Sequence, residues 1–156
     1  YAEMMLREVG WQYSGHGTRA SGVAAVHRFA RELSLPVGKV LDGSGLSYSN
    51  RETPGNLTAW LTTESTLPTY HALYDGLAVS CRKGGTLRYR LCGAHVRGAV
   101  HAKTGTLDHV TSLSGYTTTE GGREVVFSFL FGGARNVRKA SAHIDAAIAA
   151  VVRSTA

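Results

Sequence analysis

The sequence predicts an α/β (α+β) fold in which an antiparallel sheet is flanked by helices. Three observations carry this prediction. Apolar residues recur with a period near 3.6 in several segments up to Leu77, with a period of 2 between Val100 and Phe131, and again near 3.6 after Asn136. The chain has 156 residues, 43% of them hydrophobic, which is enough to bury a core without a disulfide or a structural metal. Intrinsic disorder is therefore not expected.

Two helices are predicted at the N-terminal end. The first runs from Ala2 to Val9, and Gly10 is placed at its end because glycine commonly follows the last helical residue. Ser21 is predicted to cap the second helix, which stops before Pro36. The apolar positions of this helix share one face: Val23, Val26, Ala30 and Leu33. Because the chain opens directly in a helix, we expect it to begin partway through a larger protein.

The middle of the chain alternates between loops and helices. The segment Val40–Ser47 is too rich in glycine for a helix, and it is predicted to be a short strand that enters a tight loop. Thr53 and Pro54 suit an N-cap and a first helical residue, and they predict a helix that continues through Leu61. A shorter helix is predicted from Tyr70 to Leu77.

Three strands and a closing helix are predicted for the C-terminal third. The strands are Val100–Leu107, Val110–Thr118 and Val125–Phe131, and the turn at Glu120–Gly122 joins the last two as an antiparallel hairpin. Asn136 is predicted to cap the closing helix. The predicted buried stripe of this helix is Val137, Ala140, Ile144, Ala147 and Val151.

The chain is basic, with 17 Lys and Arg against 11 Asp and Glu and a net charge of +6. This balance suits a nucleic-acid binder, a protein that works near anionic polymers, or simply an arginine-rich composition. The densest basic stretch holds Arg82, Lys83, Arg88, Arg90 and Arg97. A run of charged residues is usually a solvent-exposed surface. We therefore interpret this stretch as such a surface and predict no nucleic-acid partner. No apolar run reaches the roughly 18 residues of a membrane span, so none is predicted.

Two cysteines, Cys81 and Cys92, allow one disulfide, but their spacing does not demand it, and both states stay open. Neither belongs to a CxxC pair, and the sequence has no HExxH motif, so no metal site is predicted. No cofactor is expected.

The clearest chemical motif is Lys103-Thr104-Gly105, which falls in a predicted strand. A strand lysine that faces a cleft presents a fixed positive charge to a substrate carboxylate, and the neighbouring hydroxyl can bond the same anion. Glycine lets a substrate backbone approach the strand. An extended peptide could then bind along it as an added strand.

A second motif, Ser80 to Lys83, fits the pattern Ser-x-x-Lys, in which the lysine takes the proton of a nucleophilic serine. Both side chains would have to lie on one face of a helix. Gly84 and Gly85 follow at once and are poor helix formers, so we interpret this match as fortuitous. The chain contains no Ser-x-Asn motif.

Three blocks occur in a fixed order along the chain: Asp42–Ser47, Gly85–Leu87 with Arg90, and Lys103–Leu107. Together they resemble the serine peptidase S13 family of D-alanyl-D-alanine carboxypeptidases, the low-molecular-mass penicillin-binding proteins of the DacB type. The opening segment Tyr1–Gly10 also looks like the helix that follows Ser-x-Asn in this family. The resemblance implies the transpeptidase fold of penicillin-binding proteins and β-lactamases, C-terminal part only. Residues 1–156 would be the C-terminal portion of the catalytic domain.

The resemblance also implies a division of labour. In the family, the Ser-x-x-Lys nucleophile and base, two inserted domains and Ser-x-Asn lie N-terminal to this part. The catalytic residues implied for this chain are Lys103 and Thr104, which bind the terminal carboxylate, Gly105, which permits close approach, and Thr106, whose N–H serves the oxyanion hole.

A pocket for the diamino-acid side chain of the stem peptide is implied as well. Its residues would be Ser44, Leu46, Tyr48, Leu107 and Asp108. Tyr48 stands where the family commonly has arginine, so the preference among stem peptides is left open. Asp42 and Ser47 are expected to brace their loop by side-chain to backbone hydrogen bonds instead.

The implied substrate is a peptidoglycan stem peptide that ends in D-Ala-D-Ala. The other implied partners are β-lactams and the remaining N-terminal part of the same protein, and the implied location is extracytoplasmic, in the periplasm or cell-wall space. Three alternatives stay open: a β-lactamase or esterase of the same fold, a non-catalytic basic domain that binds cell-wall or other anionic polymers, and a catalytically dead homologue. We also expect this segment alone to expose a bare sheet edge and to be poorly soluble.

Overall fold

The computed structural model describes residues 1–155 and divides into two units. The first unit runs from Tyr1 to Trp60, and the second begins at Leu61. The point of division falls inside helix α3 (Pro54–Glu64).

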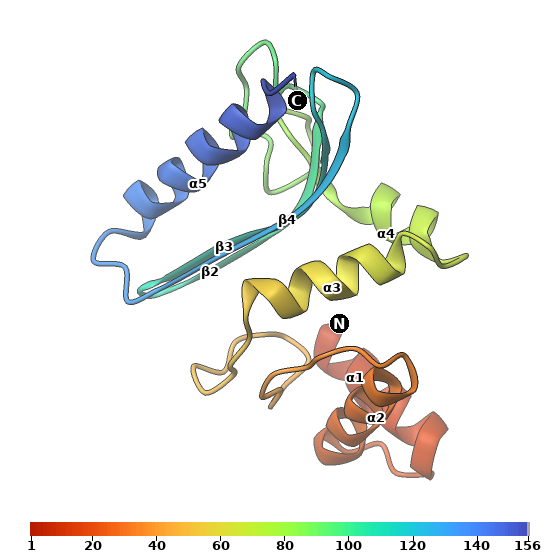
Figure 1. Ribbon diagram of the computed structural model, residues 1–156. Helices are drawn as coiled ribbons and strands as arrows, with labels where there is room; N and C mark the ends of the chain where they lie inside the picture. The colour runs from red at the N-terminus through yellow and green to blue at the C-terminus, as the bar shows by residue number, and fades with distance from the viewer. Residues whose placement is uncertain (156) are drawn as a thin grey trace. The chain divides into compact units, whose positions relative to one another are not determined.

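In the first unit, α1 (Ala2–Ser14) packs against α2 (Arg19–Glu32) (Figure 1). The prediction that Gly10 ends the first helix is wrong, because the helix continues to a left-handed Gly15 at its C-cap. Gly10 instead allows close packing: a Cβ there would lie 2.6 Å from the backbone nitrogen of Gly22. Two glycines that face each other thus let the helix backbones approach, a contact that the pattern of apolar residues does not reveal.

The cap of α2 is Thr18, where Ser21 was predicted. The backbone N–H of Ser21 donates to Oγ1 of Thr18 at 3.1 Å, and the N–H of Thr18 donates back to Oγ of Ser21 at 3.1 Å. Ser21 is therefore the third residue of a capping box, in which both hydroxyls satisfy free N–H groups of the helix start.

The strand predicted within Val40–Ser47 is absent, and this segment is a loop closed by an isolated antiparallel bridge between Lys39 and Arg51. Several backbone N–H groups of this segment donate to side-chain oxygens and not to the backbone of a neighbouring strand. The helix after Thr53 is confirmed, since Oγ1 of Thr53 accepts the N–H of Asn56 at 3.1 Å at the start of α3.

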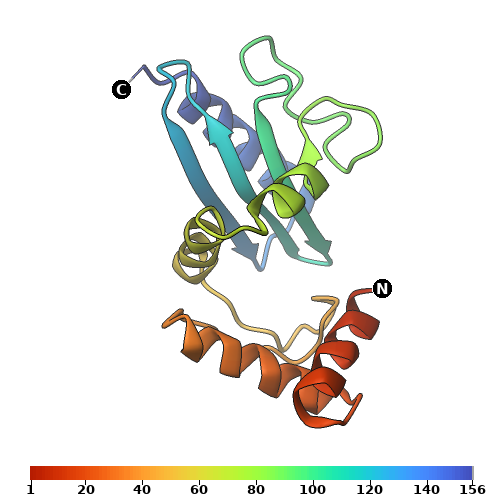
Figure 2. The ribbon, with the colours of Figure 1, turned by 90° about the vertical axis from the view of Figure 1, so that its right-hand side faces the viewer.

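The second unit is built on a four-stranded antiparallel sheet in the order β1-β2-β3-β4 (Figure 2). The strands are β1 (Ala78–Val79), β2 (Val100–Leu107), β3 (Val110–Thr118) and β4 (Glu124–Gly132). The three predicted strands are thereby confirmed to within one residue at each end. Only the two-residue strand β1 was not predicted.

Helix α5 (Val137–Val152) covers one face of the sheet and encloses the core. Its N-cap is confirmed, because Oδ1 of Asn136 accepts the N–H of Lys139 at 2.9 Å. The buried core residues are Leu87, Leu91, Val96, Val100, Ala102, Leu113, Phe127, Ile144, Ile148 and Val152. The predicted buried stripe of α5 is wrong in its second half: Ile148 and Val152 are buried where Ala147 and Val151 were expected. The buried residues of this helix follow one another at a spacing of four.

The opposite face of the sheet carries α4 (Tyr70–Gly76), which the sequence predicted (Figure 1). The ring of Tyr74 stacks on His101 of β2, with ring centroids 4.0 Å apart, and Tyr70 contacts Tyr116 of β3 edge-on at 5.3 Å. The hydroxyl of Tyr116 donates to the carbonyl of Leu61 at 2.8 Å. The sheet is thus a layer between α5 and α4. Within residues 1–155, no helix is long and apolar enough to cross a membrane.

Candidate active site

Beyond Ala102, the edge of β2 next to β1 has no strand partner among residues 1–155. Strand β1 pairs only with His101 and Ala102, and among residues 1–155 no strand pairs with β2 beyond Ala102 on that side. The N–H of Ser80 donates to the carbonyl of Val100 at 2.9 Å, and the N–H of Val100 donates to Oγ of Ser80 at 3.2 Å, so both backbone groups of Val100 face this edge.

Because backbone direction alternates along a strand, the N–H and C=O groups of Thr104 and Thr106 face the same edge. They have no strand partner in the described part of the chain. An extended peptide can therefore add to β2 from Lys103 to Leu107, with backbone hydrogen bonds supplied by Thr104 and Thr106.

Lys103 is exposed and lies on the face of the sheet away from α5, because its neighbour Ala102 is buried in the core on the other face. Its ammonium group donates to the carbonyl oxygen of Thr104 at 2.8 Å, one of the free acceptors of the edge. Opposite Lys103 in the register, Ser114 shares a hydrogen bond of 2.8 Å with Ser128. The ammonium group of Lys103 thus lies beside the open edge of β2, on the face that carries the hydroxyl groups of Ser114 and Ser128.

Thr104 contacts the loop between Cys81 and Cys92, which is distant from it in the sequence. The hydroxyl of Thr104 donates to that of Thr86 at 2.9 Å. Thr86 lies in the loop closed by a disulfide between Cys81 and Cys92, whose formation the sequence had left open. Gly85–Leu87 had been recognised as one of the three blocks, but a contact across 18 residues has no signal in the sequence.

Gly105 and Gly115 allow β2 and β3 to approach each other, on the side of β2 opposite this edge. A Cβ on Gly105 would overlap with Oγ of Ser112, and a Cβ on Gly115 would lie 2.7 Å from Cα of Ala102. The expectation that Gly105 clears the path of a bound peptide is not tested by this geometry, but the strand can carry no larger residue there without moving Ser112.

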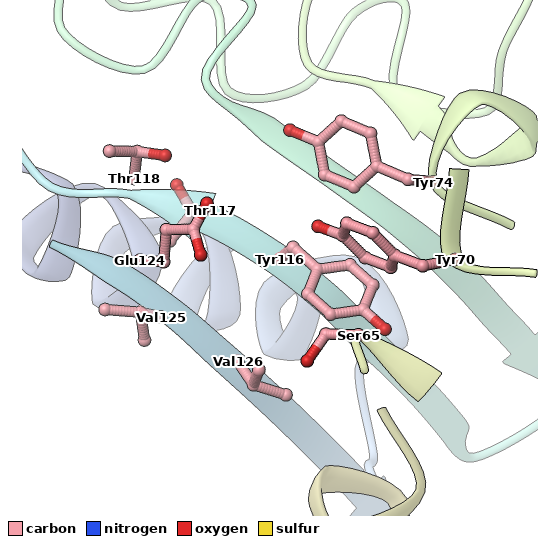
Figure 3. A pocket seen from close by; sticks show the side chains of 9 residues that line it. All are labelled: Ser65, Tyr70, Tyr74, Tyr116, Thr117, Thr118, Glu124, Val125 and Val126. Atoms are coloured by element: carbon pink, nitrogen blue, oxygen red, sulfur yellow. The ribbon is translucent and has the colours of Figure 1, made fainter. Parts of the chain in front are cut away.

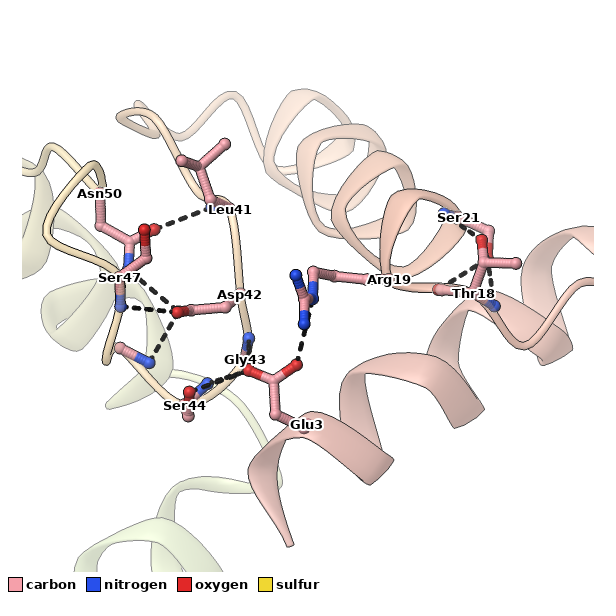
Figure 4. A network of polar contacts seen from close by, with 11 residues as sticks. Glu3, Thr18, Arg19, Ser21, Leu41, Asp42, Gly43, Ser44, Ser47 and Asn50 are labelled. Carbon is pink, nitrogen blue, oxygen red and sulfur yellow. Dashed lines mark hydrogen bonds and ion pairs between the residues drawn. The ribbon is translucent and has the colours of Figure 1, made fainter.

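The loop of the first block is braced by two carboxylates of the first unit (Figure 4). Asp42 accepts the N–H groups of Gly45 at 2.8 Å and of Ser47 at 2.7 Å, and the amide of Asn50 at 2.9 Å. Burial would raise the pKa of Asp42, but these hydrogen bonds outweigh it and lower the pKa below its ordinary value. The prediction that Asp42 braces its loop is therefore confirmed.

Glu3 of α1 holds the same loop from the other side. One of its carboxylate oxygens accepts both the N–H and the hydroxyl of Ser44 and the N–H of Gly43, each at 2.9 Å (Figure 4). The side-chain and backbone hydrogen bonds from Ser44 lower the pKa of Glu3. This contact spans about forty residues of sequence and was not predicted.

The predicted pocket residues fall in both units. Ser44, Leu46 and Tyr48 belong to the first unit, where Leu46 and Tyr48 are exposed at 64% and 58%. Leu107 ends β2 in the second unit, and Asp108 lies in the turn that follows it. The role of these five residues in a substrate pocket stays a prediction.

The D-Ala-D-Ala carboxypeptidase 3 (S13) family matches residues 1–155. The chain belongs to this family. The D-alanyl-D-alanine carboxypeptidase of Actinomadura sp. (strain R39) is 34% identical over 139 residues, which are 85% of this chain and 26% of that protein. Carboxypeptidase DacB of Mycolicibacterium smegmatis (strain ATCC 700084 / mc(2)155) is 31% identical over 161 residues, 98% of this chain and 34% of the relative.

The crystal structure of penicillin binding protein 4 (dacB) from Haemophilus influenzae, complexed with a β-lactam, matches with a TM-score of 0.80 and 26% identity. The match covers 86% of this chain and 32% of that chain. The predicted penicillin-binding fold is thereby confirmed. The chain spans about a quarter to a third of the length of these S13 relatives.

Ser80 does not have the environment of an S13 nucleophile. It is fully buried, and its hydroxyl donates to the carbonyl of Val96 at 2.6 Å while accepting the N–H of Val100. Lys83 is exposed and follows in a turn, so the two residues do not share a helical face. The interpretation of this motif as fortuitous is confirmed.

The basic stretch is not uniformly a solvated face. Arg90 forms a two-pronged ion pair with Asp145 of α5, with nitrogen to oxygen distances of 3.0 and 2.7 Å, and both side chains are largely buried. Arg82 and Lys83, in contrast, are exposed and line a cleft beside Lys103.

A second, much smaller cavity of about 50 Å³ lies between α4 and the end of the β3–β4 hairpin (Figure 3). The aromatic residues in its wall are Tyr70, Tyr74 and Tyr116. Burial raises the pKa of Tyr116 to about 12, so this hydroxyl is neutral at physiological pH. The cavity is too small for a peptide, and its side chains hold α4 on the sheet.

Proposed function

We propose that residues 1–156 form the C-terminal portion of the catalytic domain of a serine-type D-Ala-D-Ala carboxypeptidase or endopeptidase. Its substrates would be peptidoglycan stem peptides, and β-lactams would acylate it. The observation that carries this proposal is the placement of Lys103-Thr104-Gly105 on the unpaired edge of β2, in a chain that belongs to the S13 family.

The proposed chemistry divides between this chain and the part of the protein N-terminal to it. There, a serine hydroxyl attacks the carbonyl carbon of the penultimate D-alanine, and its proton passes through a lysine to the leaving amine. The carbon–nitrogen bond breaks, and free D-alanine departs. Water then hydrolyses the serine ester, which returns the proton to the serine and releases the shortened peptide.

This chain binds and orients the substrate in that scheme. Lys103 and the hydroxyl of Thr104 hold the terminal carboxylate, and the N–H of Thr106 donates to the oxygen that becomes negative during attack. The geometry supports these roles because Lys103 has no carboxylate partner among residues 1–155 and the N–H of Thr106 faces the open edge.

The pocket for the stem-peptide side chain is proposed to use Ser44, Leu46, Tyr48, Leu107 and Asp108. Tyr48 in place of an arginine would remove a cation that pairs with a substrate carboxylate, so we expect little preference for a free carboxylate on that side chain. Substrates of this kind place the protein outside the cytoplasm, in the periplasm or cell-wall space, together with its N-terminal part.

A labelled penicillin tests the proposal on the intact protein. Mass spectrometry of the labelled peptide should place the label on a serine N-terminal to Tyr1 of this numbering. Substitution Lys103→Met keeps the length of the side chain and removes its charge, and it should slow acylation by about 100-fold or more. Lys139→Met, at an exposed position of α5, serves as the matched control and should acylate at the wild-type rate.

Other outcomes would point elsewhere. Label on a serine within this chain would contradict the division of labour. Rapid release of the labelled product, with turnover, would indicate a β-lactamase. Absence of label, together with steeply salt-dependent binding to anionic polymers that Lys103→Met leaves unchanged, would indicate the non-catalytic basic domain.

A further inference from the structure

A cleft of about 490 Å³ opens beside Lys103, where the free edge of β2 ends. Two backbone segments form its walls, Asp75–Val79 and Arg82–Thr86, and Lys103 closes one side. All of these residues belong to the second unit. The proposed function uses Lys103 alone, so most of the cleft has no assigned role.

The direction of a bound peptide leads into this cleft. With its terminal carboxylate at Lys103 and Thr104 and its reacting carbonyl at Thr106, the peptide runs antiparallel to β2, and the leaving residue points toward the start of the strand. There β1 already pairs with Ala102, so no further edge is free. The leaving residue is the last residue of the peptide, and its side chain would lie beside Lys103, which lines the cleft.

The charge of the cleft favours an anion. Arg82, Lys83 and Lys103 line it together with a single carboxylate, Asp75. No carboxylate within residues 1–155 forms an ion pair with Arg82 or Lys83. Arg90 of the same loop, in contrast, is already paired with Asp145 and is not available to a ligand.

Arg82 also rests against neighbouring backbone. The disulfide between Cys81 and Cys92 closes the loop immediately before Arg82. A Cβ at Gly98 would lie 3.8 Å from Nε and Nη2 of Arg82, so the guanidinium group rests against that turn. Cations positioned before the ligand arrives lose less conformational freedom on binding it.

We propose that Arg82 and Lys83 form a subsite for an anionic side chain on the leaving residue. The preferred substrates are then peptides whose leaving residue carries a second carboxylate in addition to the terminal one. This inference rests on the proposed function, since it requires the terminal carboxylate to bind at Lys103. The peptide bond that is cleaved and the acyl-enzyme are the same for all leaving residues.

Three peptides that differ only in the leaving residue test the subsite on the intact protein. They end in D-Ala-D-Ala, D-Ala-D-Glu and D-Ala-D-Gln, and the last two have the same shape and differ in charge. The ratio of kcat/KM for the D-Glu peptide over the D-Gln peptide should be about twofold to fivefold, the range expected for a solvent-exposed ion pair. The ratio should fall as salt rises from about 0.05 to 0.5 M.

Matched variants assign this ratio to the cleft. Arg82→Gln and Lys83→Gln should each lower it, and the double variant should bring it to about one. Arg88→Gln removes the same charge from the same loop, but Arg88 lies outside the cleft, with its guanidinium over the ring of Tyr89, and the ratio should persist. Circular dichroism would verify that the variants are folded.

The failures of the two proposals are distinguishable. If the protein releases D-alanine from the D-Ala-D-Ala peptide, the proposed function stands. The subsite is then overturned by either of two results: a D-Glu to D-Gln ratio of one or less in the wild type, or a ratio that the double variant leaves unchanged. An equal loss of the ratio in Arg88→Gln also overturns the subsite, because net charge would then suffice. No cleavage of any of the three peptides by a folded protein overturns the proposed function, and the subsite with it.

Discussion

Gly115 of β3 pairs with Ala102 of β2, one register pair before Lys103. The substitution Gly115→Ala tests whether the approach of the two strands is as tight as the structure shows. The added Cβ would overlap with the carbonyl oxygen of His101 and would lie 2.7 Å from Cα and 2.8 Å from Cβ of Ala102. Two of these three atoms belong to the backbone, so no side-chain rotation can relieve the overlap.

The expected cost follows from that geometry. An ordinary carbon–carbon contact is about 3.5 Å or more, so β2 and β3 would have to separate by about 0.8 Å at Ala102. Overpacking of this kind costs about 1 to 3 kcal/mol. At a site with free space, the same replacement of glycine by alanine stabilises by about 0.4 to 1 kcal/mol, because it restricts the unfolded chain.

Gly132 offers such a site in the same sheet. It lies in β4, and a Cβ there would meet no atom within 4 Å. Unfolding of the intact protein in urea should therefore show Gly115→Ala to be less stable than Gly132→Ala by about 1 to 3 kcal/mol, because the effect on the unfolded chain is the same in both variants. Acylation by a labelled penicillin should also slow in Gly115→Ala alone, because the displaced segment continues into Lys103. Equal stability of the two variants within about 0.5 kcal/mol would refute this description of the strand contact.

Two further predictions concern the disulfide-closed loop of the second unit and the loop of the first unit that Asp42 braces. Replacing both Cys81 and Cys92 by serine should destabilise the protein by about 2 to 3 kcal/mol in denaturant and slow acylation, because the loop that holds Thr86 against Thr104 becomes less constrained; unchanged values would contradict this. Ionised Asp42 is favoured in the folded loop, so its contribution to stability is present above its ordinary pKa of 3.8 and is lost as the pH falls below that value. Hydrogen exchange at the N–H of Ser47, which donates to Asp42, should accelerate relative to its intrinsic rate in this acidic range, and protection that persists there would argue against the assignment.

The sheet and its motif were predictable because their signals are local. The strands from Val100 to Phe131 are rich in β-branched and aromatic residues and poor in helix formers, and a cap such as Asn136 acts on residues within one turn. One error occurred where two helices meet: Gly10 has the residue type of a helix end, yet it lies inside α1, where it allows the close approach of Gly22. Another error was local, because Thr18 is the N-cap of α2 and Ser21 is the third residue of the same capping box.

The sequence alone predicted the chemistry proposed for this chain: a Lys-Thr-Gly strand in an order of blocks that resembles the S13 family, and a Ser80 motif too close to Gly84-Gly85 to be a nucleophile. Only the tertiary structure decided which groups are available. It left the edge of β2 open beyond Ala102, joined Thr86 to Thr104, and paired Arg90 with Asp145 while leaving its neighbours in the cleft unpaired. These outcomes depend on contacts between residues far apart in the chain, whose formation is governed by packing of the whole core and not by any local preference.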